Sequence, residues 1–299
     1  MIRKSLVVFV VCASLSLAIS LFAAGDIPSP GANLSTAAIV DKNVAARGGL
    51  QAWRAVQTMS MEGKVGAGGN QRATLPVPVP GKRANQSILP QRPPQEAQLP
   101  FMMELKRPRK MRLELQFNGQ KAIQVFDGAN GWKLRPFLNR RVVEPYTTDE
   151  MKSSSMQADL DGYLVDYAAK GTRIELAGVE KVEDRDTYKL KLTMKNGQSI
   201  HVWIDAQTFL EAKIEGQPRR LDGVYHPVEI YYRDYRPVSG LQVPFVLETR
   251  VLPVAQTKPG LRGPAVPPEK ITIDKVVVNP KFDEALFSKP DAGAAAKAN

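Results

Sequence analysis

The chain has 299 residues, of which 41 are basic and 30 acidic, giving a formal net charge of +11. Its one cysteine, Cys12, lies in an apolar run near the N-terminus, so the remaining chain has no disulfide, thiol nucleophile or cysteine-ligated metal. The basic charges are scattered along the sequence, which favours a basic soluble surface and, for an exported protein, argues against a nucleic-acid partner.

The first 25 residues have the pattern of a secretory signal peptide. Two basic residues precede an apolar run over 6–22, and small residues follow at 23–25. Such a run is too short and too poorly flanked to anchor the chain in a membrane. Lipidation of Cys12 is disfavoured, because a valine precedes it where a small residue is expected. We therefore predict that residues 1–25 are removed on export.

A helix, a strand and an irregular segment are predicted next. Residues 35–54 carry apolar side chains at helical spacing, and Gly48-Gly49 should divide this helix in two. Residues 58–65 alternate between apolar and polar, as in a strand. Residues 66–100 hold seven prolines and no sustained period, so we expect a long mobile insertion there.

A β-meander is predicted after this insertion. Asn118-Gly119 is a strong hairpin signal, because both residues tolerate positive φ angles. Four runs with strand character follow one another through short turns, at 101–107, 111–117, 123–125 and 132–135. A helix beginning at Thr147 or Thr148 then carries an apolar stripe to Gly171, and this stripe should cover a sheet. Ser153-Ser154-Ser155 and Gly162 weaken this helix, so a division into two segments stays open.

The clearest strand pattern lies between Asp186 and Gly216. Three alternating runs are separated by Asn196-Gly197 and by a tight turn at 205–208, which predicts a three-stranded meander with one apolar face. Further strands are expected at 173–182, 228–235, 241–252 and 271–278. A second open insertion with five prolines is expected at 253–268, a short closing helix at 282–287 and a disordered tail at 291–299.

Together these elements predict a mainly β protein with some α-helix. We expect residues 26–290 to form a single domain: one large curled antiparallel sheet of about eleven strands, which is a half-barrel. Helices should close it, because a broad exposed apolar face would aggregate. Seven apolar residues are the predicted lining of the enclosed cavity: Met111, Leu113, Leu115, Leu190, Leu192, Val202 and Ile204. The alternative is that the same seven residues form a filled core.

The sequence offers little for catalysis. It lacks Gly-x-Ser-x-Gly and His-Glu-x-x-His, and its two histidines, His201 and His226, are too few and too far apart in sequence to indicate a metal site. We therefore predict no enzyme activity, no metal and no cofactor. An enzyme would need a polar cluster at the cavity mouth, for which Tyr231, Arg233 and Asp234 are the candidates.

Several segments, taken in order, resemble the bacterial outer-membrane lipoprotein-sorting (LolA/LolB-like) proteins. The opening is similar at 43–53 and 58–63, and the central hairpins are similar at 202–205, 208–215, 232–236 and 240–245. The ending is similar at 279–283 with Leu286, Phe287 and Pro290. The resemblance covers most of the chain after the signal peptide.

This resemblance implies a half-barrel of about eleven strands around an apolar cavity, in a periplasmic protein that carries acyl chains of lipoproteins or lipids. The two proline-rich insertions lengthen two loops relative to that family. The alternative is a periplasmic sensor or protein-interaction module of the same fold with a filled core. Acyl chains are thus the expected partners, other envelope proteins and peripheral membrane contact stay open, and the protein is expected to be a monomer.

Overall fold

The structure is a computed structural model that describes residues 34–67, 97–136, 140–221, 223–254, 266–291 and 293. The predicted signal peptide, nearly all of the tail and the central parts of both predicted insertions lie outside these residues. The helices are α1 (Thr36–Ala46), α2 (Leu50–Ala55), α3 (Thr148–Gln157) and the 3₁₀ helix η2 (Glu284–Phe287). The strands are β1 (Thr58–Ala67), β2 (Ala97–Lys106), β3 (Lys110–Phe117), β4 (Gln120–Phe126), β5 (Gly131–Arg135), β6 (Arg140–Pro145), β7 (Arg173–Val182), β8 (Arg185–Thr193), β9 (Ser199–Asp205), β10 (Glu211–Leu221), β11 (Val224–Val238), β12 (Leu241–Val251) and β13 (Glu269–Val278).

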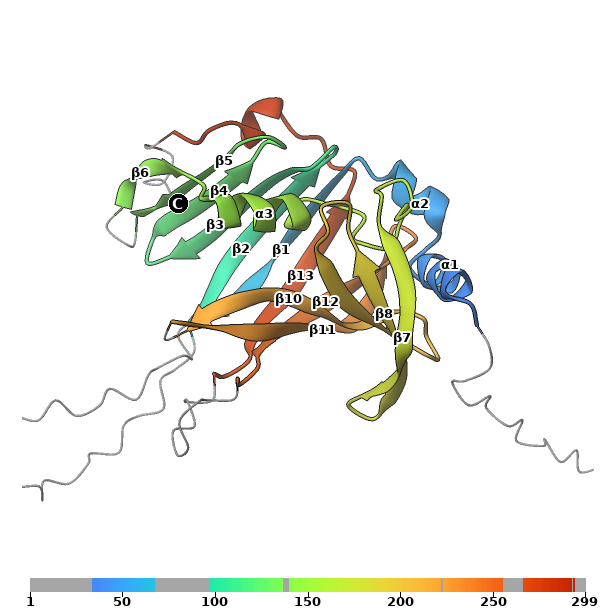
Figure 1. Ribbon diagram of the computed structural model, residues 1–299. Helices are drawn as coiled ribbons and strands as arrows, with labels where there is room; N and C mark the ends of the chain where they lie inside the picture. The colour runs from blue at the N-terminus through green and yellow to red at the C-terminus, as the bar shows by residue number, and fades with distance from the viewer. Residues whose placement is uncertain are drawn as a thin grey trace, which may run out of the picture.

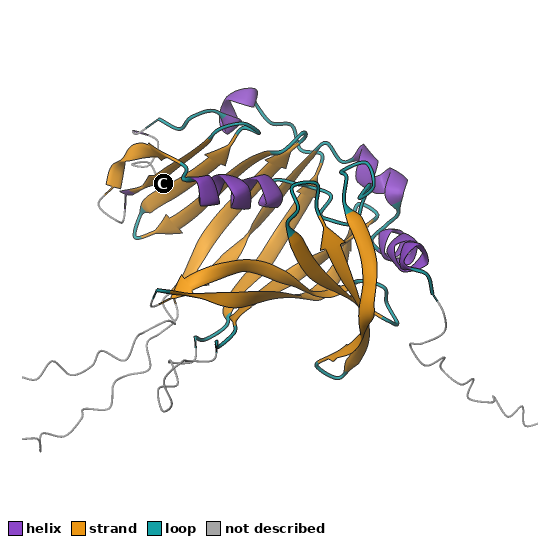
Figure 2. Cartoon of the chain, in the orientation of Figure 1, coloured by secondary structure: helices purple, strands orange, loops and turns teal. Residues whose placement is uncertain are grey.

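All thirteen strands belong to one open antiparallel sheet, which confirms the predicted mainly β, curled half-barrel (Figure 1). The strand order is β6-β5-β4-β3-β2-β1-β13-β12-β11-β10-β9-β8-β7. The last strand, β13, therefore lies between β1 and β12 and joins the two meanders predicted from the sequence. The sheet curls so that α3 lies across its concave side, and α1 and α2 lie beside the end that carries β7 and β8 (Figure 2).

Local sequence explains the turns and part of the curvature. Asn118 and Gly119 both have positive φ angles, 48° and 72°, as the Asn-Gly hairpin requires. Register shifts interrupt the pairing at five places, among them Glu62/Gly63 and Leu176/Gly178. Such bulges bend strands and increase their twist, which helps a broad sheet to curl.

The strand order forces one connection across the sheet. β6 and β7 follow each other in sequence but are the two opposite edge strands. Residues 146–172, which we call the crossing segment, must therefore span the whole width of the sheet, and they do so over the concave face (Figure 1). The crossing segment contains α3 and a series of turns at 158–171.

The structure differs from the sequence predictions in three details. The described residues form thirteen strands rather than about eleven, one of them the short β6, which the sequence did not indicate. The helix expected up to Gly171 ends at Gln157, because Gly162 and Asp166 have positive φ angles that a right-handed helix does not allow. Strand pairing also reaches into both ends of the insertion expected at 66–100, since Ala67 pairs with Ala97.

The helix predicted at 35–54 is divided as expected. Gly48 and Gly49 have φ angles of 115° and 93°, which separate α1 from α2. A Cβ atom on Gly48 would lie 2.3 Å from the carbonyl oxygen of Gly240, so the glycine also allows the loop to approach the start of β12 closely. This contact fixes the two short helices against the sheet.

Candidate functional site

The concave face carries rows of apolar side chains that run across neighbouring strands. One row is sealed: Met59 on β1 pairs with Leu105 on β2, which pairs with Met111 on β3, which in turn pairs with Phe126 on β4. These four side chains are at most 5% exposed. We call this the closed row.

The next rows, further from the β2–β3 turn, are only half-buried. They contain Met61, Met103, Leu113, Leu115, Leu247 and Ile271, all packed against the same hydrophobic cluster as the closed row. We call these the open rows. Met103 pairs with Met61 on one side and with Leu113 on the other, so the open rows cross β1, β2 and β3 without interruption.

The seven residues predicted to line a cavity fall into two groups. Leu190, Leu192, Val202 and Ile204 lie together on β8 and β9 beneath α1 and are at most 1% exposed. Met111 belongs to the closed row. Leu113 and Leu115 belong to the open rows and keep accessible surface. The structure thus brings them onto one concave face but divides them between two hydrophobic clusters.

The closed row is covered by α2 and by the turns after α3. Trp53 and Val56 come from the α2 region, and Ala158, Leu160 and Val165 come from the crossing segment. All five are at most 8% exposed. This end of the concave face is therefore a packed core.

α3 covers the middle of the face in a different way. Its sequence is polar, its only buried residue is Ser154, and Met151 is its contribution to the hydrophobic cluster. A capping box between Thr147 and Glu150 begins the helix, and Lys133 of β5 contacts both Glu150 carboxylate oxygens at 2.5 and 2.6 Å. The helix is held mainly by polar contacts at its first turn, so little apolar area opposes its displacement.

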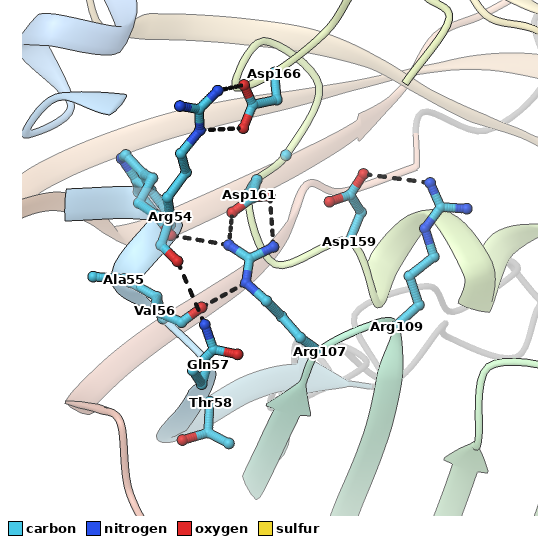
Figure 3. A network of polar contacts seen from close by, with 12 residues as sticks. Arg54, Ala55, Val56, Gln57, Thr58, Arg107, Arg109, Asp159, Asp161 and Asp166 are labelled. Atoms are coloured by element: carbon cyan, nitrogen blue, oxygen red, sulfur yellow. Dashed lines mark hydrogen bonds and ion pairs between the residues drawn. The ribbon is translucent and has the colours of Figure 1, made fainter. Parts of the chain in front are cut away.

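Arginines fasten the turns of the crossing segment to the sheet (Figure 3). Arg107, in the β2–β3 turn, donates a pair of hydrogen bonds to Asp161, one of them 2.8 Å long, and others to the carbonyl oxygens of Trp53 (2.9 Å) and Val56 (2.6 Å). The Asp161 side chain is only 7% exposed. Hydrogen bonding to Asp161 raises the pKa of Arg107. One guanidinium thus joins the β2–β3 turn, α2 and the crossing segment.

Two further arginines support this arrangement. Arg54 of α2 binds Asp166 through two hydrogen bonds of 2.6 and 2.9 Å, which lower the pKa of the Asp166 carboxyl group. Arg109 lies 3.8 Å from Asp159. The sequence did not single out any of these residues, because their partners are distant in sequence and the pairs form only when the crossing segment lies on the sheet.

A groove of about 460 Å³ opens where the two hydrophobic clusters meet. Its walls come from α1, α2 and residues 164–169, with Val40, Val44, Leu50 and Leu164 among its lining residues. Val40 and Leu164 belong to the hydrophobic cluster that contains the buried residues of β8, β9 and β10, which we call the β8–β10 cluster. Val44 packs against both this cluster and the cluster of the closed row. The groove is of the size typical of small-molecule sites.

Three polar side chains, Arg47, Glu211 and Tyr235, contact one another next to α1. Arg47 is 3.4 Å from Glu211, and the hydroxyl of Tyr235 donates to Glu211 at 3.1 Å. Arg47 also lies over the ring of Trp53, 4.3 Å from its centroid. Burial raises the pKa of Tyr235, so this phenol stays neutral at physiological pH.

The polar cluster considered for an enzyme does not form on the concave side. Tyr231 packs with Trp203, Val182 and Ala212 in a separate cluster, whereas the next residue, Tyr232, packs in the concave-side cluster. Because neighbouring strand residues face opposite ways, Tyr231 and Arg233 lie on the outer face. Asp234 is exposed and pairs with Arg236.

The described residues show no metal-binding arrangement. Within these ranges no three His, Cys, Asp or Glu side chains gather in a group that could hold an ion. His201 contacts Glu215 at 2.9 Å, and His226 contacts the carbonyl oxygen of Leu252 at 3.0 Å. Of the helices in the described part of the chain, none combines the length and the apolar character needed to cross a bilayer.

Solved structures share this architecture. The LolA superfamily protein NE2245 from Nitrosomonas europaea has a TM-score of 0.50 and 11% identity, covering 86% of this chain and 99% of that protein. The fold is LolA-like. A DUF1329 family protein from Desulfovibrio piger has a TM-score of 0.50 and 12% identity, covering 86% of this chain and 98% of that protein. A putative outer membrane lipoprotein-sorting protein domain from Vibrio parahaemolyticus has a TM-score of 0.49 and 12% identity, covering 84% of this chain and 95% of that domain. No family model and no curated protein sequence matches this chain. At such identities, the likeness establishes the LolA-like fold and not the ligand.

Proposed function

We propose that this protein is a non-catalytic periplasmic carrier that binds acyl chains of lipoproteins or lipids on its concave face. The observation that carries the proposal is the state of the open rows. Apolar side chains of β1, β2 and β3 stay half-buried, and α3, which packs against the same hydrophobic cluster through Met151, contributes almost no apolar surface of its own. An acyl chain that lay along these rows would remove from water both its own apolar surface and that of the open rows.

The chemistry of the open rows suits a ligand of variable shape. Met61, Met103 and Met151 all pack around this region, and methionine side chains adapt to irregular partners because they are unbranched and flexible. Each buried CH₂ group is worth about 0.8 kcal/mol, so a long chain gains on the order of 10 kcal/mol by leaving water. This is enough for tight binding, and partial burial would keep release possible.

Admission of a ligand requires movement of the crossing segment. Displacing α3 breaks the contacts of Lys133 with Glu150 and exposes little apolar area, whereas displacing the turns that follow breaks the Arg107–Asp161 pair and uncovers the closed row. We infer that α3 moves first and that the Arg107 contacts hold the rest of the cover in place. The resemblance to lipoprotein-sorting proteins and the LolA-like fold support this use of the concave face.

The decisive experiment compares two neighbouring methionines on β2. Met103 lies in the open rows, whereas Met102 is 37% exposed and points to the opposite face. We would titrate delipidated protein with cis-parinaric acid, a fluorescent fatty acid, and compare Met103→Arg with Met102→Arg. Met103→Arg should abolish the fluorescence increase, and Met102→Arg should leave it unchanged, with thermal unfolding as the check on folding.

A second variant keeps the test valid if Met103→Arg does not fold. Leu115→Gln places a polar amide in the open rows without a charge and should weaken binding clearly. Absence of binding by the unchanged protein, or equal binding by the Met103 and Met102 variants, would overturn the proposal. The mass of the exported protein tests the localisation, since cleavage after residue 25 would remove the predicted signal peptide.

A protein-interaction module of the same fold is the second candidate. The observation in its favour is the β8–β10 half of the concave face, where Leu190, Leu192, Val202 and Ile204 form a filled core with no accessible surface to offer a ligand. In that case, affinity purification from the envelope should recover a protein, and lipid extraction of the purified sample should recover nothing.

A further inference from the structure

One of the open rows ends in a buried cation. Met61 on β1, Met103 on β2 and Leu113 on β3 pair in succession, and Leu113 pairs with Gln124 on β4. Gln124 in turn pairs with Lys133 on β5, which is only 7% exposed. Cross-strand partners share a face of the sheet, so the row passes from three apolar side chains to an amide and then to an ammonium group. We call these five residues the amphipathic row.

The counter-ion of Lys133 comes from α3. Glu150 contacts the Lys133 ammonium group through both carboxylate oxygens, at 2.5 and 2.6 Å. α3 lies against β4 and β5, where the amphipathic row ends, and the Glu150 side chain stays 36% exposed. A lysine side chain that is buried this deeply needs an opposite charge, because desolvation disfavours an unpaired ammonium group. A movement of α3 that withdraws Glu150 therefore leaves Lys133 in need of another anion.

A tyrosine beside Lys133 adds a buried donor. The ring of Tyr146 lies on the backbone of Gly131, where an added Cβ atom would be 1.8 Å from the ring. Gly131 and Lys133 are two residues apart on β5, so they face the same side of the sheet. The Tyr146 hydroxyl is buried and has no partner at normal hydrogen-bond geometry among the described residues. Burial raises the pKa of Tyr146 to about 12, so this phenol is a neutral donor at physiological pH.

We propose that Lys133 binds the anionic headgroup of the ligand, a carboxylate or a phosphate, while the acyl chain follows the rest of the amphipathic row. The inference rests on the proposed carrier function and restricts its ligands to anionic amphiphiles. The headgroup takes the place of Glu150, so the buried ammonium group keeps a counter-ion when α3 moves. Gln124 and Tyr146 lie on either side of Lys133 or next to it on the same face, and they supply uncharged donors for the remaining oxygen atoms.

The length of the row agrees with this placement. Neighbouring strands lie about 4.8 Å apart, so the four steps from Lys133 to Met61 cover about 19 Å. One acyl chain spans about 15 Å in a bilayer, which is half of the hydrocarbon core. An anionic headgroup competes with Glu150 for the same ammonium group, whereas a neutral amphiphile of the same length gains the apolar contacts but does not replace Glu150.

The test compares two ligands that differ only in their headgroup, dodecanoic acid and dodecanol. The full exported protein is loaded with phenylnaphthylamine, a neutral fluorescent probe of apolar sites, and each ligand is titrated at neutral pH to displace the probe. Dodecanoic acid should bind about tenfold more tightly than dodecanol, because only the ionised acid forms a charge-assisted hydrogen bond with Lys133. Lys133→Gln should remove this preference and leave the affinity for dodecanol unchanged.

Glu150→Gln should produce a gain of affinity, which a folding defect would not mimic. Glutamine at this position keeps the capping box with Thr147 but removes the carboxylate that competes for Lys133. The preference for dodecanoic acid over dodecanol should therefore rise about tenfold further. Lys213→Gln is the matched control, since Lys213 is also paired with a carboxylate, that of Glu229 at 2.5 Å, and its side chain is 13% exposed. This control should not change the preference.

The outcomes separate this inference from the proposed function. Failure of the probe to bind, or of both ligands to displace it, would refute the carrier function. Displacement by both ligands with equal affinity, or a preference for the acid that survives in Lys133→Gln, would overturn the headgroup site alone. Inorganic phosphate should neither displace the probe nor weaken the binding of dodecanoic acid. Competition between phosphate and dodecanoic acid would assign Lys133 to a free anion and overturn the proposal.

Discussion

Replacement of Arg107 by alanine should weaken the attachment of the turns that cover the closed row. This guanidinium joins three parts of the chain, because it binds the Asp161 carboxylate and the carbonyl oxygens of Trp53 and Val56. The alanine substitution also removes the methylene groups of the Arg107 side chain. Arg107→Ala therefore removes this donor from the Asp161 carboxylate and from the Val56 carbonyl, whereas the Trp53 carbonyl keeps the backbone N–H of Val56 at 3.2 Å.

The magnitude follows from the burial of the partner. Removing one member of a buried ion pair costs about 3–5 kcal/mol, because the remaining charge stays desolvated. Asp161 is 7% exposed, but Arg107 itself is 29% exposed and Lys170 lies 3.9 Å from Asp161, so water and a second cation compensate in part. We expect a loss of about 2–4 kcal/mol in the free energy of unfolding, and about 1–2 kcal/mol for Asp161→Asn, which removes charge but keeps an acceptor.

Arg185→Ala is the matched control, since Arg185 also pairs with a buried aspartate. Its partner Asp205 is 4% exposed but keeps hydrogen bonds from the backbone N–H groups of Gln207 and Thr208, and Arg185 is 47% exposed. Its loss should therefore cost about 1 kcal/mol or less. Urea denaturation gives both free energies, and hydrogen exchange should show faster exchange over 158–171 in Arg107→Ala alone. Equal stability losses with unchanged exchange in that segment would refute the role assigned to Arg107.

Three other changes test particular contacts. Gly48→Ala should cost about 3 kcal/mol by urea denaturation, against about 1–2 kcal/mol for Gly49→Ala, because both glycines have positive φ but a Cβ atom at Gly48 alone would clash, with the oxygen of Gly240. Leu190→Ala should cost about 2–5 kcal/mol and leave fatty-acid binding intact, since this side chain is 0% exposed in the filled half of the face. Hydrogen bonds from arginine lower the pKa of Glu183 to about 2 from 4.5, so its contribution to stability is present above pH 4.5 and is lost as the pH falls toward 2. Glu183→Gln should therefore be less stable than the unchanged protein at pH 7 and equal to it near pH 2, and a difference that persists at pH 2 would exclude this pairing as the cause.

Local pattern was sufficient to predict the strands and most of their turns. The alternation between Asp186 and Gly216 predicted β8, β9 and β10, and the Asn-Gly pair at 118–119 predicted the hairpin between β3 and β4. These features depend on neighbours in sequence, so a period of two residues and the preference of Asn and Gly for positive φ indicate them directly. The resemblance to lipoprotein-sorting proteins correctly indicated the LolA-like fold.

Long-range pairing could not be predicted in the same way. Nothing in β13 itself indicates that it pairs with β1, more than 200 residues earlier, and this pairing places β6 and β7 at opposite edges. The exposure of the predicted lining residues depends on that arrangement. Leu113 and Leu190 have the same strand pattern, but Leu190 lies under α1 and is sealed, whereas Leu113 lies in the open rows.

The strand order also decides how the concave face can open. The crossing segment is attached to the sheet at β6 and β7, so its middle can move without breaking any ladder hydrogen bond of the sheet. The resistance comes only from side chains, and it is unequal: the turns at 158–165 bury apolar residues and bind Arg107, whereas α3 buries only Ser154. Opening should therefore begin at α3 and not at the turns that cover the closed row.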